Sequence, residues 1–222
     1  LDENSCQDSL LPHMLPKKKN WENVLSKLGI KNSDHIVIYD NSDLISSCRI
    51  WYNFLYFGHN ENLVSILNGG LKKWLKEEKK ITKEIKLFSK SCYVAKENIN
   101  MVINKDQVNK NIFNKNFELI DARSKERFQG LQPEPRKELK SGNIKGSKNL
   151  PFTELLNIAD NTFKSLEEIK SKFIGLKLDT NKKLAFTCGS GVTACVLALA
   201  NSIVSGKHPI IYDGSWSEYG LK

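Results

Sequence analysis

The sequence lacks the features of several large protein classes. It has no run of the roughly 18 apolar residues that a membrane-spanning helix needs. Its five cysteines form no CxxC pair, their number is odd, and a chain of 222 residues needs no disulfide staples, so we expect a reducing compartment, cytoplasmic or mitochondrial. No cysteine or histidine pair has metal-ligand spacing, which predicts the absence of a metal site. We expect any N-terminal targeting signal to lie upstream of Leu1, because the chain opens with neither an initiator Met nor a signal-like apolar core.

Acidic residues are the minority among the charges. The 25 Asp and Glu stand against 34 Lys and Arg, which gives a formal net charge of +9 and an attraction to anions. The lysines stand among asparagines, as in "NKNIFNKNF", and no basic run is interleaved with aromatic residues as a nucleic-acid platform requires. We therefore expect the lysines to form a solvated surface that binds neither nucleic acid nor membrane. We also expect the protein to be a monomer.

Short apolar runs that end at turn signals alternate with helix-like runs. This alternation predicts an α/β fold in which mostly parallel sheets are flanked by helices. The helix-like runs "SSCRIWYNFLYFG" and "VTACVLALANSIVSG" each end at a glycine, the residue favoured at helix C-termini. The expected strands lie within 35–40, 62–70, 117–123, 183–189 and 209–215.

The chain contains an internal repeat of strand, tight turn, helix, glycine and second strand. When the copies are aligned, Asp40 falls at the position of Cys188, and Cys48 falls at that of Cys195. We therefore predict two copies of one domain, of which only the second carries the thiol at the turn. The predicted boundaries are 1–74 for an inactive first domain truncated at its N-terminal strand, 75–98 for a charged linker, and 99–222 for the catalytic domain.

Cys188 stands where an expected strand meets the start of a helix, in "TCGSGVTA". A thiol is nucleophilic as the thiolate, and the free N–H groups and the dipole of a helix N-terminus stabilise an anion. Gly189 and Gly191 let the backbone curl so that successive N–H groups point at the sulfur. Ser190 adds a hydroxyl, and we expect Thr193 to stabilise the first helical turn.

The alternative for Cys188 is a small buried apolar residue, which most free cysteines are. Two glycines in the turn argue against it, whereas Cys48 and Cys195 fit that description and are expected in the core. A cysteine phosphatase needs an arginine at the sixth position after its nucleophile, where Ala194 stands here, so we do not expect phosphoryl transfer.

Positive charge for an anionic substrate is found in "DARSKERFQGLQPEPR". This segment follows an expected strand, and ligand sites of α/β folds form at the carboxyl ends of strands. Arg127 and Arg136 are candidates for gripping a small carboxylate, and two prolines hold Arg136 out from the core. Arg123, beside Asp121, fits an internal ion pair better.

These motifs resemble a known family. "CGSGVTA", "DARSKERFQGLQPEPR", "SGNIKGSKNLPF" and "YDGSWSEYG" are similar to the tandem rhodanese-domain sulfurtransferases, in particular the members that use 3-mercaptopyruvate. "HMLP", "VIYD", "RIWYNFLYFGH" and "LNGGLKKW" resemble the inactive first repeat of that family. The family's usual "GHIPGA" reads "GNIKGS" here, in a loop that supports the domain. The resemblance covers nearly the whole chain and implies two rhodanese-like domains.

The resemblance also implies a mechanism. Cys188 would take the sulfur of mercaptopyruvate as a covalent persulfide, release pyruvate, and pass the sulfur to a thiol, thioredoxin or cyanide, with no cofactor. Arg127 and Arg136 would bind the carboxylate and carbonyl of the substrate. Ser190, His13 and Asp2 would form a relay that protonates the departing enolate; without the resemblance, His13 fits a surface histidine. The other loop residues expected at the substrate are Gly189, Gly191, Val192 and Thr193.

Two alternative functions stay open. A thiosulfate:cyanide sulfurtransferase would use the same fold and nucleophile with another donor, although thiosulfate-preferring relatives carry Arg or Lys straight after the cysteine, where Gly189 and Ser190 stand here. A persulfide-carrying or protein-interaction module would have the same fold with incidental catalysis.

Overall fold

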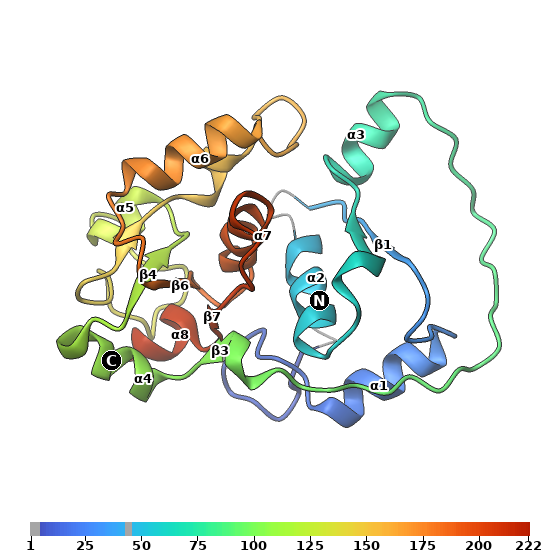
Figure 1. Cartoon of the computed structure of the whole chain (residues 1–222), viewed down its shortest axis with the longest axis horizontal. Helices are drawn as coiled ribbons and strands as arrows, with labels where there is room; N and C mark the ends of the chain where they lie inside the picture. Colours follow the sequence, from blue (N-terminus) through green and yellow to red (C-terminus); the bar gives the residue numbers. More distant parts are fainter. Residues whose placement is uncertain (1–4, 43–45) are drawn as a thin grey trace.

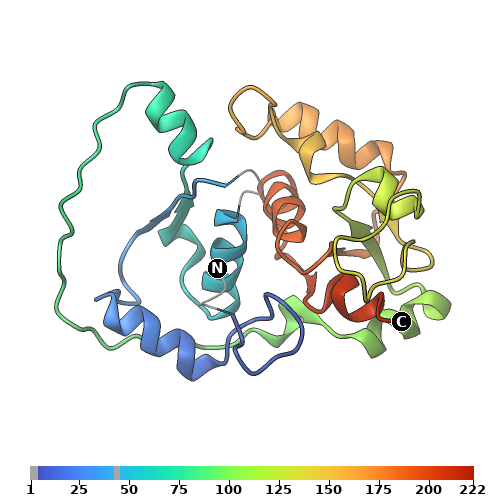
Figure 2. The same ribbon diagram turned by 180° about the vertical axis from the view of Figure 1, so that it is seen from behind.

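The computed structural model describes residues 5–42 and 46–222 of the chain (Figure 1). The predicted relay residue Asp2 therefore lies outside the described residues. Two α/β halves lie side by side, and a long connection runs around the outside of the first half (Figures 1 and 2). The two-domain α/β architecture predicted from the repeat is confirmed.

The first half contains a small parallel sheet. Strand β1 pairs with β2 in a register that places Ile36 opposite Val64 and Ile38 opposite Ile66. The second strand is shorter than its apolar run, because a 3₁₀ turn occupies Glu61–Leu63 and Gly69, with φ of 87°, leads into a helix. The elements are α1 (Lys18–Lys27), β1 (Ile36–Ile38), α2 (Ser47–Tyr56), β2 (Val64–Ile66) and α3 (Gly70–Lys76).

The second half is built on a five-stranded parallel sheet of order β3-β7-β6-β4-β5. Strands β4 and β6 are neighbours, with Asp121 opposite Thr187 at their carboxyl ends. The residues that follow these two strands therefore emerge at the same edge of the sheet, where ligand sites of such folds form. The strands are β3 (Val102–Ile103), β4 (Phe117–Asp121), β5 (Lys148–Asn149), β6 (Lys183–Thr187) and β7 (Ile211–Tyr212).

Helices cover both faces of this sheet. They are α4 (Lys105–Asn114), α5 (Lys125–Gln129), α6 (Leu166–Gly175), α7 (Ala194–Ser205) and α8 (Ser215–Tyr219), with 3₁₀ turns at Ile99–Met101 and Phe152–Leu155. Helix α7 ends at Gly206 in the left-handed conformation, as its sequence predicts. The expectation that Thr193 stabilises the first turn of α7 is wrong. Its backbone already has helical angles (φ −72°, ψ −16°), so its hydroxyl caps no N–H of the helix.

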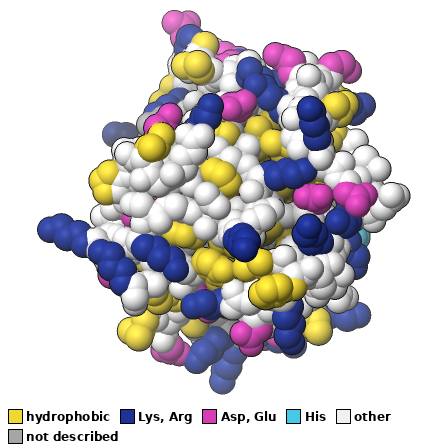
Figure 3. All heavy atoms as spheres, turned by 90° about the vertical axis from the view of Figure 1, so that its left-hand side faces the viewer, with side chains coloured by type: hydrophobic (Ala, Val, Ile, Leu, Met, Phe, Trp, Pro, Cys, Tyr) yellow, Lys and Arg dark blue, Asp and Glu magenta, His cyan; other side chains and the backbone are white. Residues whose placement is uncertain are grey.

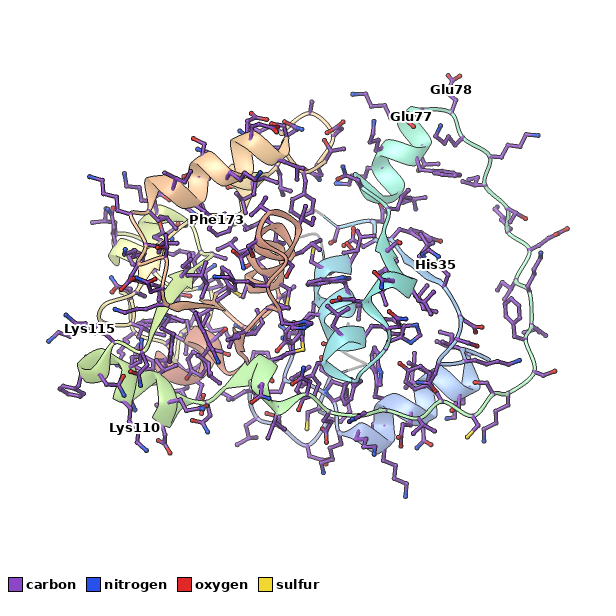
Figure 4. All side chains as sticks on the ribbon, in the orientation of Figure 1. His35, Glu77, Glu78, Lys110, Lys115 and Phe173 are labelled. Carbon is purple, nitrogen blue, oxygen red and sulfur yellow. The ribbon has the colours of Figure 1, made fainter. Side chains whose placement is uncertain are left out.

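One hydrophobic core extends through both halves. Helices α2 and α7, which occupy equivalent places in the repeat, pack against each other between the two sheets (Figures 1 and 2). Cys48 and Cys195 are fully buried in this core, which confirms their predicted place. Phe173 of α6, labelled in Figure 4, packs edge-on against Phe186 with ring centroids 6.4 Å apart.

The predicted linker has two parts. Residues 77–90, which begin at Glu77 and Glu78 in Figure 4, are exposed and run around the outside of the first half. They touch it where Trp74 Nε1 donates to the Lys80 carbonyl at 3.0 Å and where Phe88 lies against Gly29. Residues 91–98 return to the first half, where Tyr93 and Ala95 are buried. The N–H of Tyr93 donates to Ser26 Oγ at 3.0 Å. Only the first part thus behaves as the charged spacer that its composition predicts.

Lysines are spread over the outer face of the second half. In Figure 3 they alternate with apolar and acidic side chains over this face, and Lys110 and Lys115 project outward from α4 and its end (Figure 4). Among the helices of residues 5–42 and 46–222, none has the length and apolarity to cross a bilayer.

Candidate active site

Cys188 directly follows β6 and is only 2 % exposed. It opens the Cys188 loop, residues 188–193, which leads into α7. The start of α8 holds this loop, because the N–H of Trp216 donates to the Cys188 carbonyl at 3.0 Å and the N–H of Ser217 donates to the Gly189 carbonyl at 2.8 Å. Ser215 Oγ accepts from the Cys188 N–H at 3.2 Å. The first residues of the loop are therefore held by strand β6, which they follow, and by the start of α8.

The Cys188 loop presents a row of open N–H groups. Within the part of the chain that the structure describes, no protein group accepts a hydrogen bond from the backbone N–H of Gly189, Ser190, Gly191, Val192 or Thr193. Buried N–H groups are rarely left unpaired, and successive free N–H groups at a helix N-terminus form an anion site. The loop thus has the donors that a thiolate or a bound anion requires.

His13 reaches this loop from the first half of the chain. Its Nδ1 lies 2.8 Å from Ser190 Oγ, two residues after the cysteine. The backbone of His13 adopts φ of 60°, an uncommon conformation for a residue with a side chain. The N–H of Leu15 donates to Asp213 Oδ2 at 2.8 Å and fixes the segment that carries the histidine. The structure therefore brings together two of the three predicted relay residues.

Arg127 lies against the Cys188 loop. A Cβ placed on Gly189 would lie 3.2 Å from Arg127 Nη2, so glycine at this position leaves room for the guanidinium. Glu134 accepts from Arg127 Nη2 at 2.5 Å and from its Nε at 3.3 Å, while the arginine side chain remains 26 % exposed. The structure thus places one predicted carboxylate-binding cation at the loop and orients it with a buried acid.

Arg136 is placed differently. It is half-buried in the segment after α5, and its side chain forms no hydrogen bond or ion pair with any residue in 5–42 or 46–222. The structure therefore shows no hydrogen bond or ion pair between Arg136 and the Cys188 loop. Its predicted substrate role stays a prediction.

Arg123 forms the internal ion pair expected from its sequence position. It donates to both oxygens of Asp121 and, at 2.8 Å, to Glu134 Oε1. Its guanidinium lies 4.4 Å from the centre of the Trp216 ring. Arg123 is 2 % exposed, so it belongs to the support of the site rather than to its surface.

The other cysteines differ in environment from Cys188. Burial raises the pKa of the Cys195 thiol to about 12 and raises that of Cys48 well above its usual value. Both therefore remain thiols at neutral pH, and Cys195 Sγ donates to the Gly191 carbonyl at 3.2 Å. Cys6 is half-buried and Cys92 is exposed, and the site involves neither.

The first half has a carboxylate at the equivalent turn. Asp40 follows β1, and its Oδ2 accepts from the N–H of Ser47 at 2.7 Å and from Ser46 Oγ at 3.0 Å, at the N-terminus of α2. This matches the alignment of Asp40 with Cys188. A fixed carboxylate occupies the anion position of the first half, and a carboxylate cannot carry a persulfide.

Four residues that support the site were not singled out in the sequence. Arg49 is a lone charge within the apolar run of α2. Asp213 follows β7 as Asp40 follows β1, in "IIYD" against "VIYD", and Ser215 lies in the turn after it. Glu134 stands between two prolines. In the sequence, Arg49 could have been found as a charge in an apolar run, Asp213 through the repeated "IYD", and Glu134 as an acid between two prolines. Among the described residues, no group of three or more His, Cys, Asp or Glu side chains is arranged to hold a metal ion.

Comparisons with known proteins bear on this arrangement. The model of the family described as "Rhodanese-like domain" matches residues 9–77 and 104–222. The chain is 40% identical to thiosulfate sulfurtransferase of Mus musculus over 98% of this chain and 74% of that protein. It is 38% identical to 3-mercaptopyruvate sulfurtransferase of Mus musculus over 100% of this chain and 75% of that protein.

Solved structures agree with the family comparison. The Tum1 protein from Saccharomyces cerevisiae superposes with a TM-score of 0.86 at 29% identity, covering 98% of this chain and 76% of that one. SseA from Escherichia coli, described with the 3-mercaptopyruvate enzymes, has a TM-score of 0.84 at 31% identity, covering 98% of this chain and 80% of that one.

Proposed function

The chain belongs to the rhodanese-like family and is a sulfurtransferase built from two such domains, and we propose that its sulfur donor is 3-mercaptopyruvate. Cys188 carries the sulfur as a covalent persulfide and passes it to a thiol, thioredoxin or cyanide. The reaction needs no resident cofactor, since the sulfur stays bound to the protein between the two steps.

The hydrogen bond between His13 and Ser190 carries this proposal. Cleavage of the C–S bond of mercaptopyruvate leaves an electron pair on carbon, and the resulting enolate of pyruvate needs a proton. Thiosulfate leaves as sulfite and has no such need. A hydroxyl 2.8 Å from a histidine ring nitrogen, two residues after the nucleophile, is suited to deliver that proton.

The reaction proceeds in two displacements. The Cys188 thiolate attacks the sulfur of the donor, so that the S–S bond forms while the C–S bond breaks and its electron pair goes to the enolate. Ser190 protonates the enolate to pyruvate and recovers a proton from His13. An acceptor thiolate then attacks the outer sulfur of the persulfide, and the electron pair of the S–S bond returns to Cys188.

The charges around the loop fit this sequence of anions. The open N–H groups of residues 189–193 stabilise the Cys188 thiolate and then the persulfide. Arg127 holds the carboxylate of the donor at the edge of the loop, and we assign Arg136 to the same anion. Asp2, outside the described residues, remains the proposed third member of the relay.

Thiosulfate is the second candidate donor. Some mammalian enzymes named thiosulfate sulfurtransferase are 40% identical to the chain, slightly more than the 36–38% of the mammalian enzymes named 3-mercaptopyruvate sulfurtransferase. The five residues after Cys188 carry no cation, which favours a donor held by arginines outside the loop. The ratio of kcat/KM for the two donors on one preparation decides between them.

The test uses two substitutions in the loop. Incubation with mercaptopyruvate is expected to add the mass of one sulfur atom to the peptide that contains Cys188, and Cys188→Ser is expected to abolish pyruvate release. Ser190→Ala is expected to lower kcat with mercaptopyruvate by about 10²-fold or more, because it removes the proton donor. The measurements are peptide mass spectrometry and pyruvate formation.

Thiosulfate turnover of the Ser190→Ala variant is the control. It should be retained, since sulfite departure needs no proton. Equal losses with both donors would contradict the protonating role of Ser190, and a folded wild-type protein that gains no sulfur on Cys188 from mercaptopyruvate would overturn the proposed donor.

A further inference from the structure

Arg49 is a buried cation of the first half that contacts the site of the second half. It lies in α2, the helix that packs on α7, and is 1 % exposed. Neighbouring α2 residues such as Trp51 and Phe54 are apolar and buried in the hydrophobic core. Packing alone therefore does not account for a charge at this position, since burying a charge is costly unless it is paired.

The guanidinium of Arg49 joins three segments that are far apart in the sequence. Its Nη1 donates to the Gly191 carbonyl at 3.2 Å. Its Nη2 donates to the carbonyl of His13 at 2.9 Å and to Asp213 Oδ1 at 2.7 Å. The other oxygen of Asp213 accepts from the N–H of Leu15. The Arg49–Asp213 ion pair thus binds both the backbone of the His13 segment and the backbone of the Cys188 loop, and it holds the two segments together.

The two carbonyls bound by Arg49 lie at the two ends of the Ser190–His13 hydrogen bond. Gly191 follows Ser190 directly, and the other carbonyl belongs to His13 itself. Gly191 has φ of 79°, and a Cβ on it would lie 2.9 Å from Arg49 Nη1, so this glycine permits the close approach. Because the planar guanidinium of Arg49 holds both of these backbones, it limits how far the Ser190 hydroxyl and the His13 ring can move apart.

We propose that Arg49 is a positioning residue that sets the distance between Ser190 and His13. It acts through the backbones of Gly191 and His13 and does not touch the donor. The first half then contributes to the reaction as well as to the core, because both Arg49 and His13 come from it. This role rests on the proposed proton delivery by Ser190.

Arg49 remains charged in its buried place. Burial by itself lowers the pKa of Arg49, but the adjacent Asp213 carboxylate raises it above its ordinary value. The guanidinium is therefore a constant cation over the working pH range. Its effect on the site is geometric, through hydrogen bonds directed from two nitrogens of a planar fork, an arrangement that the single ammonium nitrogen of a lysine cannot reproduce.

The test compares Arg49→Lys in two backgrounds. The lysine keeps a charge for Asp213, but its three N–H donors sit on one nitrogen and cannot reach the acceptors that Arg49 binds through two nitrogens. In the wild-type background we expect kcat with mercaptopyruvate to fall about 10- to 100-fold, as for a small misplacement of reacting groups, while KM changes little. In the Ser190→Ala background we expect little further loss, because the bond that Arg49 positions is already gone.

Tyr52→Phe is the matched control. Tyr52 lies one turn along α2, and its buried hydroxyl donates to the Met101 carbonyl at 2.7 Å. Its ring centre lies 5.7 Å from the Arg49 guanidinium, and phenylalanine keeps that ring while it removes the hydroxyl. Its loss should lower the melting temperature without lowering kcat. Asp213→Asn, which keeps the shape of the side chain, is the second variant and replaces Arg49→Lys if the lysine variant folds poorly. It should show the same loss of kcat in the wild-type background and little further loss in the Ser190→Ala background.

The outcomes separate this inference from the function on which it rests. If Ser190→Ala leaves kcat unchanged, the proposed proton delivery is wrong and the role of Arg49 falls with it. If Ser190→Ala lowers kcat while folded Arg49→Lys and Asp213→Asn retain it, the proton delivery stands and only the positioning role is overturned. Equal losses from Arg49→Lys in both backgrounds would also overturn it, since Arg49 would then act independently of Ser190.

Discussion

Glu134 is a buried carboxylate between two guanidinium groups. Its side chain is 1% exposed and accepts from Arg123 on one side and from Arg127 on the other. Arg123 also has Asp121 as a partner, whereas Glu134 is the acid of the described residues that orients Arg127. The position of Arg127, the cation proposed to bind the donor, therefore depends on a residue that lies beneath the surface.

Glu134→Gln is expected to affect stability and donor binding together. It removes one buried negative charge between two cations, which should lower the free energy of unfolding by about 3 kcal/mol. The orientation of Arg127 is then less restricted, so KM for mercaptopyruvate should rise more than kcat falls. Urea unfolding and steady-state kinetics measure the two effects.

Glu138→Gln provides the same chemical change four residues later. Glu138 is exposed, and its carboxylate has no ion pair within residues 5–42 and 46–222. Neither stability nor KM should change in this variant. A Glu134→Gln protein as stable as the wild type, with unaltered KM, would show that Glu134 does not orient Arg127.

At the scale of elements, helix α7 is flanked by two glycines in the left-handed conformation. Gly191 precedes it with φ of 79°, and Gly206 follows it with φ of 65°. Their surroundings differ. A Cβ on Gly206 meets no atom within 4 Å, whereas one on Gly191 meets Arg49 Nη1 at 2.9 Å and the Asp213 carbonyl at 3.1 Å. Gly191 therefore allows the first half to contact the second through Arg49, whereas Gly206 only ends the helix.

The two glycines predict different outcomes for the same substitution. Gly206→Ala should cost about 1–2 kcal/mol of stability, from backbone strain alone, and leave kcat unchanged. Gly191→Ala should cost more and also lower kcat, because it displaces the Arg49 guanidinium from the Cys188 loop. Thermal unfolding and pyruvate release of both variants test this, and equal effects on kcat would refute the distinction.

At the scale of the whole molecule, the two halves are held together by their core rather than by the linker. The largest hydrophobic cluster contains Trp21 and Trp51 of the first half together with Phe186 and Val196 of the second. The linker residues 77–90 are exposed throughout. The connection is thus accessible to a protease while the interface is not.

Limited trypsin treatment should cleave the linker and leave the halves associated. The expected sites are the exposed Lys79, Lys80, Lys83, Lys86 and Lys90. The nicked protein should elute from gel filtration as one species and retain turnover, because Arg49, His13 and the Cys188 loop keep their contacts. In urea the fragments should separate, which serves as the control. Separation in native buffer would show that the linker is needed for association.

Much of the fold could be predicted because its signals are local. Apolar runs that end at turns located β1, β2, β4, β6 and β7 but missed the two-residue strands β3 and β5. The repeated plan revealed two domains and the exchange of Asp40 for Cys188. The loop at Cys188 was recognisable because glycines and a helix start lie beside one cysteine. The stabilisation of the first helical turn by Thr193 was mispredicted, since the conformation of a helix cap depends on the path of the preceding loop. Its predicted place at the substrate stays a prediction.

The sequence by itself determined the candidates for chemistry, namely a thiol in a glycine-rich turn before a helix and arginines after a neighbouring strand. Only the tertiary structure decided which partners act on them. His13 and Ser190 are 177 positions apart, and Arg49 and Gly191 are 142 apart. Contacts at such separations depend on how α2 packs against α7, and no local pattern records that packing. Arg49 was for this reason only a charge in an apolar helix until the fold placed it beside the Cys188 loop.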